Sequence, residues 1–301
     1  MAVQREIWQA LIVEGLFADN SFMSKSTNDD MYVNMGKTVH IPNAGAPSKV
    51  EVNRSSVPAT AEKRTDTDIN YNLDELTTDP IYIPHAETVE LSYSKRNSVI
   101  SQDREQLIEK ASEQMLYNWA PGDSEFVRTT GNAVAAHTDK ATGNRKSMTR
   151  FDVLKLMEKF NAQNIPQTDR YLLLDAYMYS QLLNDMTETD KNMFMASANA
   201  QKGILGQLYS FNIMMRSQVL RYVTAGTLSK WETTGETTDN AAGLAWHVGS
   251  VSRALGEVKM FDSLNNPLYY GDIYSFLVRV GGRCRRQDKK GLLAIVQDTA
   301  V

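Results

Sequence analysis

Six basic side chains near the C-terminus are the groups in this sequence best placed to bind a charged partner. They are Arg279, Arg283, Arg285, Arg286, Lys289 and Lys290, and with Asp288 among them the segment carries a charge of +5. Such a patch can attract DNA phosphates or an acidic protein surface. DNA contact stays open, but an exposed strand connection, or pairing with an acidic segment of a neighbouring molecule, is the favoured interpretation.

Cys284 is the second candidate for chemistry, because Arg283 and Arg285 on either side could lower the pKa of its thiol. No histidine lies nearby in the sequence to form a nucleophilic pair, so an incidental thiol is favoured. Because it is the single cysteine, an internal disulfide framework and a cysteine-rich zinc site are excluded.

The other titratable residues show no pattern that catalysis requires. The histidines lie far apart in the sequence, and those near prolines are interpreted as structural: the four are His40, His85, His137 and His247. The phosphate-binding glycine loops, the zinc-protease helix motif and the nucleophile elbow are missing. The acidic pairs lack the ligand spacing of a calcium loop. We therefore predict no catalytic, cofactor-binding or metal-binding residue, no cofactor and no enzymatic activity.

Composition and charge limit the remaining classes of function. The chain has 301 residues, enough for one large domain or two small ones, and a net charge of -4. That charge argues against a protein whose main task is to coat itself with nucleic acid. The sequence shows no signal peptide and no apolar run long enough to span a bilayer, so we expect a soluble protein made in the cytoplasm.

The N-terminal third reads as segments that lack a core of their own. Residues 4–17 place apolar side chains, including Ile7, Trp8 and Leu11, on one face of a predicted helix. Residues 45–86 alternate like two strands around a polar tip and carry a net charge of -3. Because an isolated hairpin is marginal in water, we expect this one to lie on another subunit, with a loose surface loop as the alternative.

Acidic residues of this hairpin are the predicted partners of the basic cluster. They are Asp66, Asp68, Asp74 and Glu75.

The clearest helix runs from Val99 to Trp119 and would be about 31 Å long; Pro121-Gly122 ends it. Thr149 and Asp152 form a capping-box variant before a helix at Phe151. The apolar run from Arg170 to Asp175 predicts a buried strand, and a short helix from Ala176 to Leu183 follows.

The C-terminal half adds further strands. Residues 203–217 predict a turn into a strand, 224–242 an exposed loop, and 243–250 a strand running into a short helix to Ala254. A final pair of strands would run from Gly271 to Val280 and from Leu292 to Val296, joined by a turn at Gly281-Gly282 and the basic segment. The predicted class is α+β.

This order of elements resembles the major capsid proteins of tailed bacteriophages with the HK97-type fold. The resemblance covers nearly the whole chain and rests on the segment Gly36-Lys37-Thr38-Val39-His40-Ile41-Pro42, on Gly203-Ile-Leu-Gly206 leading to Phe211, and on Gly271-Asp272 to Gly282. It implies five regions. They are an N-terminal arm (1–35), an extended loop (36–86), a peripheral domain (87–165) with a spine helix at about 99–120, an axial domain (166–260), and C-terminal strands (261–301) returning to the peripheral domain.

The resemblance also implies a function and partners. The chain would self-assemble into hexamers and pentamers of an icosahedral head around double-stranded DNA, which it would contact non-specifically on the inner face. Its partners would be itself, a separate scaffolding protein, a portal and decoration proteins, in a virion assembled in the host cytoplasm, with no membrane. Subunit contacts would use Ile7, Trp8, Leu11, Asp66, Asp68, Asp74, Glu75, Arg283, Arg285, Arg286 and Lys289.

Two alternatives stay open. One is an encapsulin-like nanocompartment shell of the same fold. The other is an enzyme or a nucleic-acid-binding α+β protein.

Overall fold

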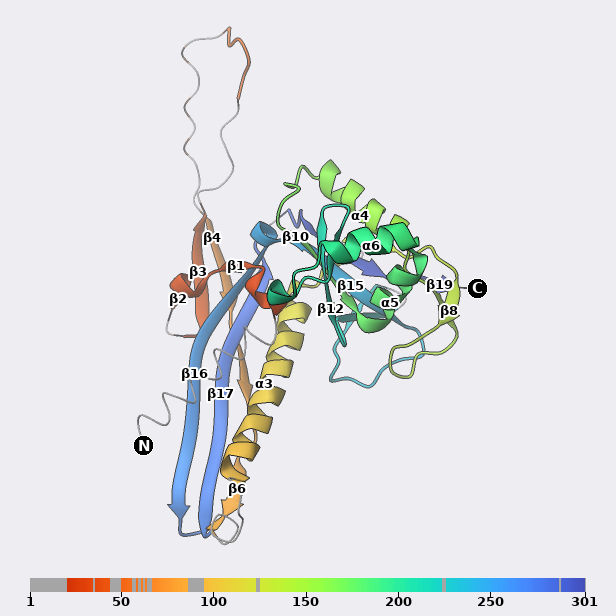
Figure 1. The fold of residues 1–301 in the computed structure, drawn as a ribbon. Helices are drawn as coiled ribbons and strands as arrows, with labels where there is room; N and C mark the ends of the chain where they lie inside the picture. The colour runs from red at the N-terminus through yellow and green to blue at the C-terminus, as the bar shows by residue number, and fades with distance from the viewer. Residues whose placement is uncertain are drawn as a thin grey trace.

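The computed structural model describes residues 21–34, 36–43, 50–55, 58, 61, 63, 67–85, 95–122, 125–223, 226–286 and 288–300. The predicted N-terminal helix with Ile7, Trp8 and Leu11 lies outside these residues, as does Asp66. Figure 1 shows an elongated part, a compact part beside it, and residues 50–55 beyond the upper end of the elongated part. Residues 38–72, to which this segment belongs, are called the excursion here. No helix among the described residues combines the length and the apolar character needed to cross a lipid bilayer.

The elongated part is built on one long antiparallel hairpin, β16 (Val251–Asn266) and β17 (Gly271–Cys284). Two short strands, β5 (Asp74–Thr77) and β6 (Ile81–Pro84), pair with the outer edge of β17. On the other edge β1 (Thr27–Asn28) pairs with β16 in parallel.

Helix α3 (Lys95–Trp119) lies along the hairpin (Figure 1). The predicted helix therefore exists, and it begins four residues before Val99. Its buried side chains, among them Leu107, Met115 and Trp119, pack with Phe276 and Val278 of β17 in one core cluster. The packing of this apolar stripe against the strands is what makes the helix stable.

The compact part contains an eight-stranded sheet. Its strands are β7 (Phe126–Arg128), β10 (Arg170–Asp175), β11 (Gly206–Leu208), β12 (Phe211–Arg216), β13 (Leu220–Val223), β14 (Leu228–Ser229), β15 (Asp239–His247) and β18 (Leu292–Val296). The helices of this part are α4 (Arg150–Ala162), α5 (Ala176–Asp185) and α6 (Glu188–Ala196).

Strand β10 confirms the predicted buried strand, and its continuous apolar run is explained by cover on both faces. Leu172 and Leu174 point into the core cluster that includes α4 and α5, whereas Tyr171 and Leu173 point into the cluster shared with α3. Successive side chains of a strand face opposite sides, so a strand covered twice needs apolar residues throughout.

The predicted capping residues act at the start of α4. The buried carboxylate of Asp152 accepts hydrogen bonds from the backbone N–H of Thr149 at 3.0 Å and from its hydroxyl at 2.9 Å. The same carboxylate accepts from Thr130, so it also fixes the preceding loop.

Two smaller sheets complete the structure. One consists of β2 (Val33–Asn34), β3 (Thr38–Asn43) and β4 (Thr67–Asn72) at the base of the excursion; the other consists of β8 (Ala133–Ala135), β9 (Asn144–Lys146) and β19 (Thr299–Ala300). Short 3₁₀ helices lie at η1 (Ser21–Ser24), η2 (Asp30–Tyr32), η4 (Ala200–Lys202) and η5 (Val248–Ser250).

Four sequence predictions are wrong. The strand-like alternation predicted in residues 45–86 fails at Val50 and Val52, which are exposed and lie outside any strand. The predicted loop 224–242 ends in strand β15, where Asp239 and the residues after it are buried. The predicted helix to Ala254 is the start of β16.

The fourth error concerns the chain end. Gly281 and Gly282 make no turn, because β17 continues through them to Cys284. The last two strands do not pair with each other: β17 pairs with β16, whereas β18 joins β15 and β7 in the compact part. Of these two strands, β17 lies in the sheet beside α3, whereas β18 lies in the eight-stranded sheet.

Candidate interaction surfaces

Five of the six basic side chains have partners within the chain: Arg279, Arg283, Arg285, Arg286 and Lys290. Arg279 donates to Glu75 at 2.9 Å and lies 3.3 Å from Glu257, so its charge is neutralised on the outer edge of the hairpin. Arg283 donates to the backbone oxygen of Asn70 at 3.0 Å and thereby ties β17 to the base of the excursion.

The other basic residues lie on the connection between β17 and β18. A terminal guanidinium nitrogen of Arg285 lies 3.7 Å from the fully buried carboxylate of Asp29. Arg286 donates two hydrogen bonds to Asp288, at 2.9 and 2.8 Å, and this pairing holds the pKa of Asp288 well below its usual value. Lys289 is exposed on the same connection. The basic cluster therefore offers less unpaired positive charge to a partner than the +5 counted from the sequence.

Two of the predicted acidic partners also have partners within the chain. The carboxylate of Asp74 accepts from Asn118 at 2.6 Å and from Gln114 at 3.1 Å, which fixes β5 against α3. Glu75 pairs with Arg279. Asp68 lies on β4 opposite Pro42. Sequence reasoning missed these contacts because the partners are distant along the chain.

Cys284 is not an activated thiol. Burial raises its pKa above the ordinary value, and the nearby positive charge of Arg283 offsets this only in part. The raised pKa agrees with the incidental-thiol interpretation that the sequence favours.

The histidines do not converge, and no group of three or more metal-binding side chains occurs in the described part of the chain. His137 contacts a carboxylate, since its Nε2 lies 2.9 Å from an oxygen of Asp175. The second oxygen of Asp175 accepts from the backbone N–H of Met178 and caps α5. This contact holds the β8–β9 loop against the sheet, and no sequence motif announced it.

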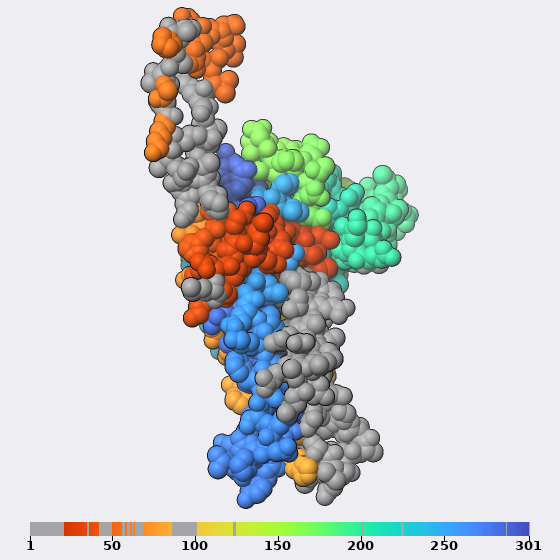
Figure 2. Space-filling model, turned by 90° about the vertical axis from the view of Figure 1, so that its left-hand side faces the viewer, coloured from red at the N-terminus to blue at the C-terminus, as the bar shows by residue number. Residues whose placement is uncertain are grey.

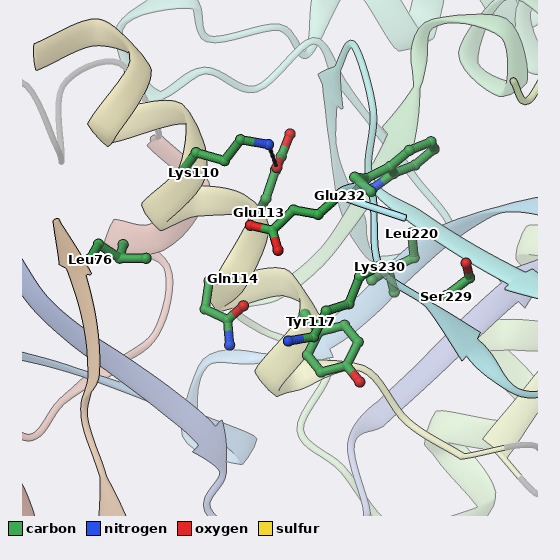
Figure 3. A pocket seen from close by; sticks show the side chains of 10 residues that line it. Leu76, Lys110, Glu113, Gln114, Tyr117, Leu220, Ser229, Lys230 and Glu232 are labelled. Carbon is green, nitrogen blue, oxygen red and sulfur yellow. Dashed lines mark hydrogen bonds and ion pairs between the residues drawn. The ribbon is translucent and has the colours of Figure 1, made fainter. Parts of the chain in front are cut away.

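A groove between α3 and the β13–β14 region is shown in Figure 3. It is lined by Leu76, Lys110, Glu113, Gln114, Tyr117, Leu220, Ser229, Lys230, Trp231 and Glu232. Its lining side chains contact one another, because Lys110 pairs with Glu113 at 2.8 Å and the Lys230 ammonium lies 4.8 Å from the centre of the Tyr117 ring. The enclosed space is ≈ 30 Å³, far below the roughly 300 Å³ or more of a typical small-molecule site.

Solved structures give the decisive comparison. No protein-family model and no curated protein sequence matches the chain. The capsid of Ralstonia phage GP4 matches with a TM-score of 0.64 at 12% identity, covering 92% of this chain and 88% of that one. The capsid of cyanophage P-SCSP1u matches with a TM-score of 0.60 at 17% identity, covering 92% and 86%.

This chain has a phage capsid fold. The resemblance inferred from the sequence is thereby confirmed at the level of the fold. A virus-like particle from Pyrococcus furiosus matches as well, with a TM-score of 0.54 at 10% identity, over 97% of this chain and 99% of that one.

On this capsid fold, exposed apolar side chains mark two projecting ends. Residues 50–55 lie at the far end of the excursion (Figure 2), and their Val50 and Val52 are 88% and 87% exposed. Leu268, Tyr269 and Tyr270 lie at the closed end of the β16–β17 hairpin. Large apolar side chains grouped on projections are typical of contact surfaces for other proteins.

Proposed function

We propose that this chain is the major capsid protein of a tailed phage, and that it self-assembles into hexamers and pentamers of an icosahedral head enclosing double-stranded DNA. The capsid fold supports this proposal most strongly. Assembly into a virion within the host cytoplasm, with a scaffolding protein, a portal and decoration proteins, belongs to the same proposal.

The observation that carries the proposed self-assembly is the exposure of Val50 and Val52. The base of the excursion is a regular sheet of β3 and β4, and its described tip, residues 50–55, stands clear of the body with Val50 and Val52 exposed (Figure 1). Such an extension is marginal alone in water and gains stability when its apolar side chains are covered. A neighbouring subunit is the proposed cover.

The domain assignment follows as part of the proposal. Residues 1–35 form an arm and 36–86 the extended loop. Residues 87–165, with α3, are assigned to the peripheral domain, and residues 166–260 to the axial domain at the centre of each hexamer or pentamer. Because β18 lies in the eight-stranded sheet, we assign the last strands to both domains.

Expression of the full chain tests the proposal. Negative-stain microscopy and sedimentation should reveal closed shells, tubes or rings of five and six subunits. The proposal would be contradicted if the protein stayed a monodisperse monomer at every concentration, with residues 45–86 packed on their own core.

The virus-like particle from Pyrococcus furiosus favours one second candidate, an encapsulin-like compartment without a genome, because that match covers nearly all of both chains. The contents of particles purified from a host distinguish the two, since the main proposal requires double-stranded DNA inside and the second requires a protein cargo.

A further inference from the structure

Four buried polar side chains lie around the first residues of strand β15 in the compact part. They are Arg145 of β9, Arg221 of β13, Asp239 of β15 and Gln297, which directly follows β18, and each is at most 3% exposed. These four residues are called the polar cluster here. Buried polar groups in proteins are nearly always hydrogen-bonded, so the partners of each one need to be identified.

The register of the sheet brings the polar cluster together. Arg221 lies opposite Ala241 on one side of β15, and on the other side the N–H of Gln297 donates to the backbone oxygen of Ala241 at 2.9 Å. Residues opposite each other share a face of the sheet, so two long side chains flank a small one and leave room between them. Asp239 lies two residues before Ala241 and therefore faces the same side. Arg145 reaches in from β9, where its guanidinium donates to the backbone oxygen of Asp239 at 3.0 Å.

Within the described part of the chain, four polar atoms of the cluster have no hydrogen-bond partner. Three are donors, namely Nε of Arg145, Nε of Arg221 and Nε2 of Gln297. The fourth is an acceptor, Oδ1 of Asp239, whose other carboxylate oxygen accepts from the N–H of Glu236 at 2.9 Å. Nε of Arg221 lies 3.2 Å from that other oxygen, an ion-pair distance without the geometry of a hydrogen bond. Buried donors and acceptors without partners destabilise a fold strongly, so this group of atoms indicates a bound ligand.

The kinds of atom present decide which ligand fits. A halide or a phosphate could accept from the donors, but it could not donate to Oδ1 of Asp239, and its charge would be repelled by that carboxylate. A metal cation could bind the carboxylate, but it would meet the positive charges of Arg145 and Arg221. Water carries no charge, donates and accepts, and is held inside proteins by two to four polar partners.

We propose that an ordered water molecule is built into the polar cluster. It donates to Oδ1 of Asp239 and accepts from Nε2 of Gln297 and from the Nε of one of the two arginines. These are three hydrogen bonds, the usual number for a buried water. The water thereby joins β15 to β9 or β13 and to the last residues of the chain. The site belongs to the single folded subunit, so it does not depend on the proposed function.

The substitution Gln297→Met tests the site by the sign of its effect. Methionine is close to glutamine in length but offers no donor. With a water in the cluster, the substitution removes one of its partners and should raise the equilibrium constant of unfolding roughly tenfold, measured by urea titration of the unassembled full chain. Without a water, the substitution removes a donor that has no partner, so this constant should stay the same or fall. That result would overturn the proposal.

Gln207→Met is the matched control for the change of side chain. The exposed amide of Gln207 donates to Asn212 at 2.7 Å, so its loss should change the unfolding constant by about twofold or less, as is usual for surface substitutions. Equal effects of Gln297→Met and Gln207→Met would count against the water.

A structure of the unmodified protein, from a map that resolves ordered waters, gives a measurement that does not require a variant to fold. A peak should lie within roughly 3.2 Å of both Oδ1 of Asp239 and Nε2 of Gln297. The proposal is wrong if these two atoms bond directly to each other, or if the space between them is empty. It is also wrong if the peak becomes stronger when chloride is replaced by bromide, because the ligand would then be a halide.

Discussion

Gly282 lies where β17 passes closest to α3, and replacing it with alanine should separate the two elements. A Cβ added there would meet the sulfur of Met115, the backbone oxygen of Ser252 at 2.5 Å and the indole nitrogen of Trp119 at 2.7 Å. The same indole nitrogen donates to that oxygen of Ser252 at 2.8 Å. The new methyl group would therefore sit on an existing hydrogen bond in the core.

The expected loss has two parts. Forcing a methyl group into a well-packed core costs about 1–3 kcal/mol. Disturbing the hydrogen bond of the fully buried Trp119 adds roughly 1 kcal/mol. The Gly282→Ala chain should thus be about 2–4 kcal/mol less stable, which lowers the urea midpoint on the order of 1 M for the usual dependence on denaturant.

Urea denaturation of the unassembled chain, followed by tryptophan fluorescence, measures this loss. The signal is well placed, because the ring centres of Trp119 and Trp246 lie 5.8 Å apart at the junction. Gly122→Ala is the matched control, since a Cβ at Gly122 would have no heavy atom within 4 Å. If Gly282→Ala and Gly122→Ala had the same midpoint, the close approach of β17 to α3 described here would be refuted.

Three further predictions follow from buried or paired groups. The buried guanidinium of Arg221 lies 3.2 Å from the carboxylate of Asp239. Asp239→Ala removes this counter-ion and should lower the free energy of unfolding by about 3–5 kcal/mol in thermal or urea melts. A loss below about 1 kcal/mol would contradict this. Burial raises the pKa of Tyr71 to about 12 from 10.0. The unfolded chain therefore ionises at lower pH than the folded chain, and the free energy of unfolding falls as pH rises between these values. Over that interval the Tyr71→Phe variant should lose less stability than the unmodified chain. Replacing Arg286 and Lys289 with glutamate should impair assembly, seen by sedimentation, while leaving the circular dichroism of the monomer unchanged; normal assembly would rule out their proposed pairing with a neighbour's acidic loop.

Sequence patterns of a few residues correctly predicted the helices and strands that depend on those residues alone. The capping side chains of α4, the apolar run of β10 and the amphipathic stripe of α3 all lie within a few turns or residues of the structure they specify. The fold class and the resemblance to capsid proteins depended on such elements and their order.

Strand β16 was missed because its alternation changes phase. Leu255 pairs opposite Val280 and Val258 opposite Val278, so one extra residue bulges from β16 between them. An extra residue shifts the buried face from odd to even positions. The period of two that identifies a strand is therefore interrupted in the sequence, although the strand itself continues.

The glycine pair was misread for a different reason. Consecutive glycines usually indicate a turn, but here they lie within β17 and allow close approach from both sides. A Cβ at Gly281 would meet Leu73, whereas one at Gly282 would meet Met115. Neither neighbour is visible from the local sequence, because both come from segments far earlier in the chain.

The candidate surfaces were the least predictable part. The charge of the basic cluster could be counted, but its availability depends on contacts such as Glu75 to Arg279, which join residues 204 positions apart. The polar cluster had no signal in the sequence either, since Arg145, Arg221 and Gln297 come together only once the sheets have formed.

The pairing of β5 and β6 with β17 also sets the order in which a newly made chain can fold. During synthesis the ribosome releases β5, β6 and α3 long before their partner strand exists. The elongated part can form only when nearly the whole chain has emerged. A prematurely terminated chain, lacking residues after 270, would not have the completed sheet. A chain that ends before residue 271 therefore lacks the strand with which β5 and β6 pair.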